Sequence, residues 1–229
     1  MSDTPTQAIG TIHLHKQGHV GTIVFDNQAK FNAMNYDMWV GLPRFIQDCV
    51  DDHDIRLIVL TGAGEKAFVS GADISQFGER RSGGDAAEEY NRATEAAYAS
   101  VLNCPKPTLA KIRGICMGGG LYLAASCDLR ICNDRARFAM PAAKLGLGVR
   151  YESVRRLMEV LPSAHAADIV FTGHAIEVRA LDATLALMSY LGCSYLVGGA
   201  EMGFVGTGHP YVTPYGACRA KDGYIIVAP

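Results

Sequence analysis

Two glycine loops in this chain have residue types that could bind an oxyanion. The first is Ser70-Gly71-Ala72-Asp73 and the second is Gly118-Gly119-Gly120. Each follows an apolar strand-like run and leads into helix-like sequence, so the backbone N–H groups of both could face one oxygen. Two convergent amides stabilise the negative charge that develops on a thioester carbonyl as it becomes an enolate or a tetrahedral oxyanion. The loops therefore predict acyl chemistry, whereas the alternative is that they only make tight turns and close helix–sheet contacts.

The elements that must position these loops alternate between strands and helices. Strand-like runs cover residues 11–15, 21–25, 56–61, 108–112 and 129–132, and helix-like runs cover 36–51, 88–102, 151–161, 163–171 and a stretch from Leu121. Pro43 interrupts the first helical pattern. Residues 79–95 are polar and charged, which indicates a mobile loop that becomes helical at about Glu88. This alternation predicts an α/β layer fold.

Composition excludes several classes of function. The chain has 229 residues, of which 49% are hydrophobic and 19% charged, which is ordinary for one or two globular domains. Its formal net charge of −2 gives no electrostatic reason to bind nucleic acid or an anionic membrane. Residues 1–10 lack the layout of a signal peptide, and no apolar run reaches the roughly 20 residues of a membrane span. We expect a cytoplasmic protein.

Cysteine and histidine patterns give no strong metal signal. The seven cysteines form no Cys-x-x-Cys pair and lie mostly among apolar neighbours, which indicates reduced core thiols. His13 and His15 would share one face of a strand, near His19. Because no cysteine or carboxylate lies close to them in the sequence, we expect no metal site there.

From about residue 10 to about residue 173, an ordered series of motifs carries a family resemblance. The motifs are Lys30-Phe31-Asn32-Ala33-Met34, Leu57 to Gly64, Lys66 to Ile74, Gly114 to Gly120, Cys127-Asp128-Leu129-Arg130 and Phe138-Ala139-Met140-Pro141. In this order they resemble the crotonase superfamily, also called the enoyl-CoA hydratase/isomerase family. The resemblance implies a crotonase-like spiral core of ββα units, and it implies assembly as a homotrimer or hexamer.

The resemblance also implies roles for particular residues. The amides of Ala72 and Gly119 would polarise the carbonyl of an acyl-CoA, and the segment around Lys30 and Ala33, with Ala72, Asp73 and Ile74, would line the coenzyme A site. Coenzyme A would enter as part of the thioester substrate, and no permanently bound cofactor is implied. Asp73 could act as a base, or it could cap the helix that it precedes.

The acid/base positions of the family differ in this chain. Hydratases of the family use two glutamates, and the matching positions here are Tyr122 and Ala142. A tyrosine hydroxyl ordinarily titrates near 10 and alanine has nothing to titrate, so neither replaces a carboxylate. Tyr122 and Tyr151 are the candidates for proton delivery. The alternatives are that Tyr122 fills volume in a buried helix and that Tyr151 only opens a helix.

From about residue 176 the resemblance changes. Ile176 to Met188, Gly206 to Pro210, Thr213 to Gly216 and Asp222 to Pro229 are similar to a helix, a loop and a strand of the class III CoA-transferases. The sequence therefore predicts a crotonase-like acyl-CoA-binding domain over residues 1–175 and a partial transferase-like segment over 176–229. That helix plus loop/strand segment would replace the usual helical C-terminal part of a crotonase and weaken oligomer packing. We expect no transferase activity, because the carboxylate that carries the acyl group in that family lies in an earlier part.

Three functional hypotheses follow from these observations. In the first, the protein is an acyl-CoA enzyme that stabilises a thioester enolate or oxyanion, and it acts as a lyase, decarboxylase or hydrolase rather than as a true hydratase. In the second, it is a non-catalytic binder of CoA thioesters or an inactive fusion remnant. In the third, residual hydration occurs through water alone.

Overall fold

The computed structural model describes residues 10–80, 84–177, 216–219 and 224–227. It divides into two units, Met1–Arg179 and Ala180–Pro229. In the second unit the described residues form a hairpin of antiparallel strands, β10 (Gly216–Arg219) and β11 (Tyr224–Val227), in which Gly216 pairs with Val227. The predicted helix after Glu177 lies outside the described residues. All other elements belong to the first unit.

The larger sheet of the first unit has five strands in the order β1-β2-β3-β5-β7. Their bounds are β1 (Thr11–Gln17), β2 (Val20–Asp26), β3 (Leu57–Gly62), β5 (Thr108–Ile112) and β7 (Leu129–Cys132). β1 pairs antiparallel with β2, and the remaining neighbours are parallel, with Ile58 opposite Thr108 and Leu109 opposite Leu129. Parallel strands need crossover connections, and helices supply them here. The predicted α/β fold is therefore confirmed.

A smaller sheet holds the strands that lead to the glycine loops. Its order is β4-β6-β8-β9, with bounds β4 (Ala67–Val69), β6 (Ile115–Met117), β8 (Arg137–Ala139) and β9 (Ile176–Glu177). β4, β6 and β8 run parallel, and β9 pairs antiparallel with β8. Ile176 and Glu177, expected to begin a helix, are therefore strand residues, because pairing with β8 satisfies their backbone groups.

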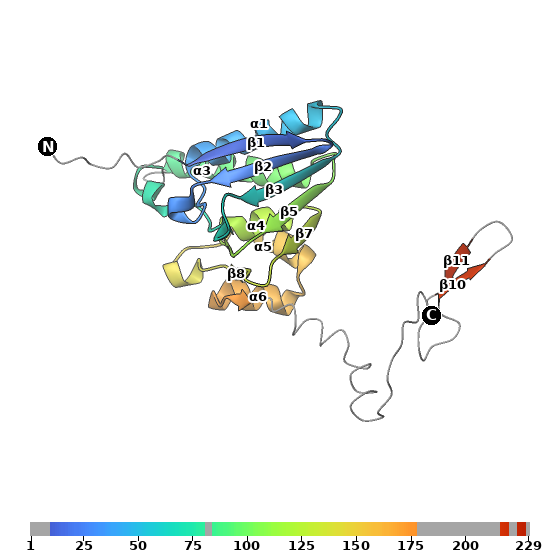
Figure 1. Ribbon diagram of the computed structural model, residues 1–229. Helices are drawn as coiled ribbons and strands as arrows, with labels where there is room; N and C mark the ends of the chain where they lie inside the picture. The colour runs from blue at the N-terminus through green and yellow to red at the C-terminus, as the bar shows by residue number, and fades with distance from the viewer. Residues whose placement is uncertain (1–9, 81–83, 178–215, 220–223, 228–229) are drawn as a thin grey trace, which may run out of the picture. The chain divides into compact units, whose positions relative to one another are not determined.

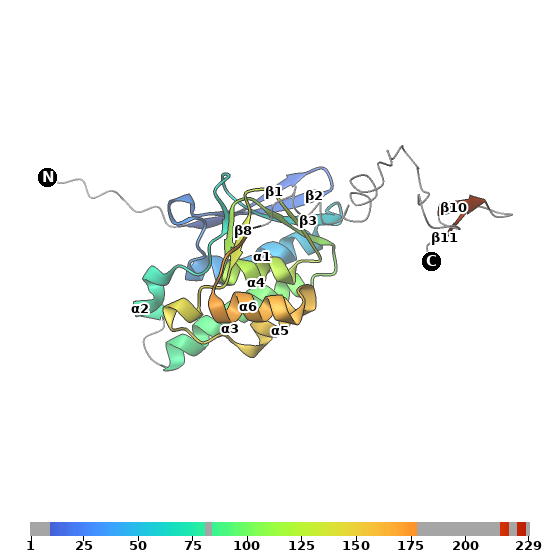
Figure 2. The same ribbon diagram turned by 90° about the horizontal axis from the view of Figure 1, so that it is seen from below.

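The main helices gather on one side of the larger sheet, as Figures 1 and 2 show. They are α1 (Tyr36–Asp51), α2 (Phe77–Arg80), α3 (Gly84–Leu102), α4 (Gly119–Ser126), α5 (Tyr151–Val160) and α6 (Ser163–Thr172), with short 3₁₀ turns η1 (Gln28–Lys30), η2 (Ile74–Gln76) and η3 (Ala143–Leu145). α1 continues through Pro43, because Trp39, Leu42 and Ile46 bury its apolar face. Among the described residues, no helix combines the length and apolar character that crossing a bilayer requires.

α3 begins four residues before the predicted helix start and takes in part of the predicted mobile loop. Its buried face contains Tyr90, Thr94, Ala97 and Tyr98, which recur at helical spacing. The charged residues Asp85, Glu88, Glu89 and Arg92 of the segment are exposed. Burial of this one face thus outweighs the local polarity that indicated a loop.

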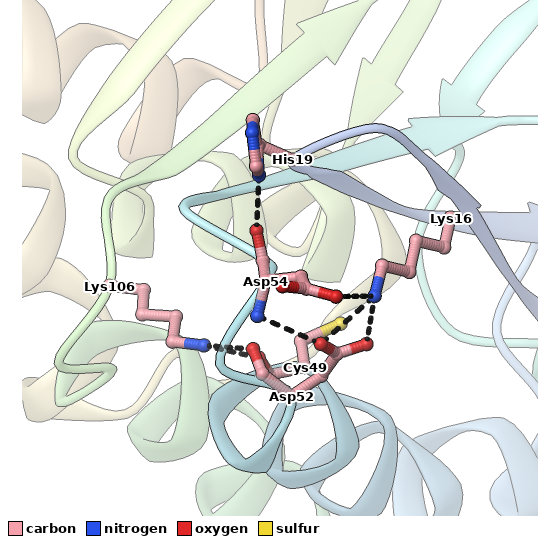
Figure 3. Close-up of polar contacts among 6 residues, drawn as sticks. All are labelled: Lys16, His19, Cys49, Asp52, Asp54 and Lys106. Carbon is pink, nitrogen blue, oxygen red and sulfur yellow. Dashed lines mark hydrogen bonds and ion pairs between the residues drawn. The ribbon is translucent and has the colours of Figure 1, made fainter.

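Polar contacts fix the C-terminal end of α1 against the sheet (Figure 3). The Lys106 ammonium donates to the carbonyl oxygens of Cys49, at 2.8 Å, and Asp52, at 2.7 Å. A cation at this end of a helix satisfies carbonyls that have no partner within the helix and complements the helix dipole. Lys16 pairs with the carboxylates of Asp52 and Asp54, and its hydrogen bonds lower the pKa of Asp52.

Candidate active site

The first glycine loop is held by a single parallel bridge between Met34 and Ala72. The amide of Met34 donates to the carbonyl of Gly71, and the amide of Asp73 donates to the carbonyl of Met34, each at 2.8 Å. Because successive amides of an extended chain point to opposite sides, the N–H of Ala72 is directed away from this bridge. Gly71 has a φ of +118°, a backbone conformation that residues with a side chain rarely adopt, so the loop needs glycine there.

The second glycine loop starts α4. Gly118 has a φ of +53°, and its amide donates to the carbonyl of Ala139. Gly119 is the first residue of the helix, so its N–H has no acceptor within the helix and lies at the positive end of the helix dipole. A Cβ atom on Gly120 would lie 2.1 Å from the carbonyl oxygen of Val69, so helix and strand approach here as closely as glycine allows.

The two loops lie against each other. A Cβ atom on Gly71 would lie 3.6 Å from the amide nitrogen of Gly119. Ala72 and Gly119 both line one cavity of about 410 Å³. Within the described part of the chain, neither of their amides donates a hydrogen bond to a protein acceptor. The structure therefore brings two predicted oxyanion donors to the wall of one cavity.

Tyr122 and Ala142, at the acid/base positions of the resemblance, also line this cavity. Tyr122 is 6% exposed, and its hydroxyl has no hydrogen-bond partner among the described residues. Burial raises the pKa of this hydroxyl, and the positive charge of Arg150 opposes that change only in part. Tyr122 is thus a neutral phenol near neutral pH. Of the described residues that line the cavity, none is an aspartate or a glutamate.

Tyr151 lies elsewhere. It is the first residue of α5, its exposed fraction is 74%, and it is not among the described residues that line the cavity. This placement agrees with the alternative in which Tyr151 only opens a helix.

The segment predicted to bind coenzyme A is arranged around an ion pair. The Lys30 ammonium lies 2.7 Å from the Asp73 carboxylate and 2.9 Å from the Ser75 hydroxyl. Asp73 also accepts from the amide and the hydroxyl of Ser75, and so caps η2. Burial would raise the pKa of Asp73, but these hydrogen bonds outweigh it and hold that pKa below its ordinary value. Asp73 is thus paired and charged, which suits a cap better than a base.

The remaining residues of that segment differ in exposure. Ile74 is 63% exposed and lines the cavity, whereas Ala33 is buried. Phe31 and Asn32, which lie between Lys30 and Ala33, have positive φ values of 52° and 56°. The Asn32 side chain holds this turn, because it accepts from the amide of Asn27 and donates to the carbonyls of Ala63 and Ala67.

Sequence reasoning missed three large side chains that shape the cavity. Trp39 is the one tryptophan of the chain and is fully buried, and Tyr98 contacts it edge to face, with ring centroids 5.4 Å apart. The Tyr98 hydroxyl donates to the carbonyl of Gly119 at 3.4 Å. Arg150, directly before α5, also lines the cavity. In the sequence it follows the glycine-containing stretch 146–148 closely.

The thiols and histidines that the structure describes form no further site. Cys49, Cys116 and Cys127 are buried and free, Cys104 is half-buried and free, and Cys132 is exposed and free; burial raises the pKa of every one. Cys193 and the Cys218 side chain lie outside the described part. His13 and His15 have ring centroids 6.2 Å apart, and His19 contacts the carbonyl of Asp54. Within the described ranges, no group of three or more His, Cys, Asp or Glu is placed to hold a metal ion.

The sequence of this chain is similar to those of known proteins. The family model described as enoyl-CoA hydratase/isomerase matches residues 15–184, past the predicted boundary at residue 175. A short-chain-enoyl-CoA hydratase of Clostridium acetobutylicum is 30% identical over 169 residues, which are 74% of this chain and 64% of that protein. A carnitinyl-CoA dehydratase of Escherichia coli is 33% identical over 164 residues, which are 71% of this chain and 61% of that protein. The chain thus spans a little under two thirds of the length of these curated relatives.

Solved structures show the same likeness. An enoyl-CoA hydratase/carnithine racemase from Magnetospirillum magneticum superposes with a TM-score of 0.72 at 28% identity, over 85% of this chain and 76% of that one. An enoyl-CoA hydratase/isomerase family protein from Hyphomonas neptunium gives a TM-score of 0.71 at 29% identity, over 82% and 74%. The chain therefore belongs to the enoyl-CoA hydratase/isomerase family.

Proposed function

We propose that this protein acts on acyl-CoA thioesters and stabilises an enolate or oxyanion with the amides of Ala72 and Gly119. The observation that carries the proposal is that both amides lie at one cavity without a protein acceptor among the described residues. A thioester oxygen placed between them gains negative charge as the reaction proceeds, and the N-terminus of α4 favours that charge. Interactions that strengthen as charge develops lower the barrier, because they are stronger in the transition state than in the ground state.

The reaction is better explained as that of a lyase, decarboxylase or hydrolase than as hydration. Adding water to an enoyl thioester needs groups that take and give protons near neutral pH, and carboxylates serve well when they line the pocket. This cavity has Tyr122 and Ala142 at the positions of the resemblance, and no described lining residue is a carboxylate. Tyr122, a neutral phenol, suits donation of a proton or hydrogen bond to an enolate and does not suit activation of water.

The proposal is tested with a panel of enoyl-, β-keto- and malonyl-type CoA thioesters and two variants at Gly119. Gly119→Pro removes the N–H at a helix position where proline is tolerated. Gly119→Ala is the matched control, because it keeps the N–H and adds a Cβ at the same place, 3.0 Å from the Tyr98 hydroxyl. We expect turnover by the wild type and a rate for Gly119→Pro roughly 100- to 1,000-fold below that of Gly119→Ala, the effect of losing one oxyanion donor.

Two results would redirect the proposal. Equal rates for the two Gly119 variants would remove the amide from the mechanism. Binding of acyl-CoA by calorimetry without turnover of any thioester would favour the second candidate, a non-catalytic binder, which the absence of carboxylates from the described cavity lining supports.

The similarity of residues 176–229 to class III CoA-transferases remains a proposal about ancestry. Two observations support it: the sequence similarity, and a strand at Tyr224–Val227, where the similarity predicts one. We propose no transferase reaction for it.

A further inference from the structure

The wall of the cavity between α3 and α5 is built around the guanidinium of Arg150. It donates to the carbonyl of Asn91 at 3.2 Å and to the hydroxyl of Thr94 at 3.0 Å, and it lies 3.0 Å from the carboxylate of Glu95. A guanidinium has five N–H donors, and these three contacts leave some of them free. Asn91 and Thr94 also line the cavity, so the group that they hold lies at its surface.

A second guanidinium lies close to this wall. Arg156 is 8% exposed, and its guanidinium carbon is 5.4 Å from the centre of the Tyr98 ring, which lines the cavity. Its Nε and Nη1 atoms are buried with no hydrogen-bond partner, and none of the described carboxylates pairs with it. Burying an arginine without a partner is costly, and such groups are rarely found without an anion nearby.

The charges of this wall do not cancel. Arg150 is balanced by Glu95, but nothing in the described chain balances Arg156. Helix α5 begins directly after Arg150, and helix α4 begins at Gly119. Because Arg150 and Gly119 both line the cavity, the positive ends of two helix dipoles add positive potential to it. No described lining residue contributes a negative charge. The cavity therefore favours a ligand that carries negative charge beyond the thioester oxygen.

We propose that Arg150, supported by the buried charge of Arg156, forms a subsite for a carboxylate on the acyl group, so that the preferred substrates are CoA thioesters of dicarboxylic acids. This inference rests on the proposed function, because it assumes that the thioester end lies at Ala72 and Gly119. A planar guanidinium matches the geometry of a carboxylate and binds it with charge-assisted hydrogen bonds. The carboxylate is a recognition group here, since a guanidinium that stabilises it in the ground state does not help it to leave.

The test compares two thioether analogues of equal length, S-(3-carboxypropyl)-CoA and S-butyl-CoA, by isothermal titration calorimetry with the full chain. Thioethers have no carbonyl, so their binding does not depend on the amides of Ala72 and Gly119. We expect the wild type to bind the carboxylate analogue roughly tenfold or more tightly than S-butyl-CoA, the effect of a hydrogen bond to a charged group. Equal affinities would overturn the proposal.

Three variants test which residues cause the preference for the carboxylate analogue. Arg150→Met should abolish the preference while leaving the affinity for S-butyl-CoA within about threefold, which also shows that the variant is folded. Glu95→Gln should increase the preference, because it removes the competing carboxylate from Arg150. Arg156→Met should reduce the preference and should also stabilise the fold, because an unpaired buried charge is replaced by an apolar chain of similar size.

The outcomes of these experiments separate a failure of the carboxylate subsite from a failure of the proposed catalysis. A preference that survives Arg150→Met, or falls in Glu95→Gln, would overturn the subsite. If the thioether pair behaves as expected but no thioester is turned over, the subsite stands and the proposed catalysis fails. If thioesters are turned over but the carboxylate gives no advantage, the proposed function stands and the subsite fails.

Discussion

Replacing Tyr122 with phenylalanine should make the protein more stable and less active. The hydroxyl of Tyr122 is buried and has no partner among the described residues, and an unsatisfied buried polar group costs about 1–3 kcal/mol. Removing it also leaves a small void, which offsets part of that gain. We therefore expect Tyr122→Phe to raise the free energy of unfolding by about 1 kcal/mol, or the melting temperature by about 2–4 °C for a domain of this size.

Tyr98→Phe is the matched control for this prediction. The rings of Tyr98 and Tyr122 contact each other with centroids 6.3 Å apart, so both changes remove a hydroxyl from the same aromatic cluster. The Tyr98 hydroxyl, however, donates to the carbonyl of Gly119 at 3.4 Å. Its loss should lower the free energy of unfolding by about 0.5 kcal/mol, the low end for one hydrogen bond because the contact is long. The two substitutions should thus have opposite signs.

The change in the free energy of unfolding of each variant is measured by urea unfolding at equilibrium, and activity is measured on the acyl-CoA panel. A Tyr122→Phe variant less stable than the wild type would refute the reasoning, because the hydroxyl would then have a partner in the folded state. A more stable variant with unchanged turnover would show that Tyr122 only fills volume. Greater stability with lost turnover is the result expected when an active site keeps an unsatisfied group for its reaction.

Three further predictions concern the residues that hold the loops and α1 in place. Lys106→Met should lower the free energy of unfolding by about 1–3 kcal/mol in urea titrations, because the carbonyls of Cys49 and Asp52 lose a charged donor; an unchanged midpoint would contradict this cap. The pKa of Asp73 is lowered in the folded state, so its contribution to stability is present above the ordinary carboxyl pKa of about 4 and disappears as pH falls through the lower folded value. The stability difference between wild type and Asp73→Asn should therefore shrink on acidification, and a difference independent of pH would count against it. Asn32→Ala should cost about 2 kcal/mol or more, since it removes the side-chain bonds and leaves alanine at a φ of 56°. Asn32→Gly, which tolerates that φ, should be the less damaged of the two by thermal unfolding, and the reverse order would exclude backbone strain as a cause.

Local signals in the sequence were sufficient for most elements. The strand at 108–112 and the helix at 36–51 have the predicted bounds, because their apolar periods match the faces that they bury. The strand at 129–132 also has the predicted bounds, although its four residues are exposed. The start of α3 was misplaced because the sequence is polar there, and only packing against α1 and α4 shows that one face is buried. β9 was missed because two residues carry no period, and their pairing with β8 is a long-range contact.

The candidate site divides in the same way. The two glycine loops can be read from local sequence, since a positive φ, a close helix–strand contact and a bare amide each require glycine or its neighbour locally. The assignment of Tyr122 and Ala142 to acid/base positions comes from the resemblance and stays a prediction. Long-range packing, in contrast, brings Ala72 and Gly119 to one cavity, leaves Tyr151 outside its described lining, and puts Arg150 and Arg156 near one wall. These relations join residues far apart in the chain, and a one-dimensional pattern contains no distance between them.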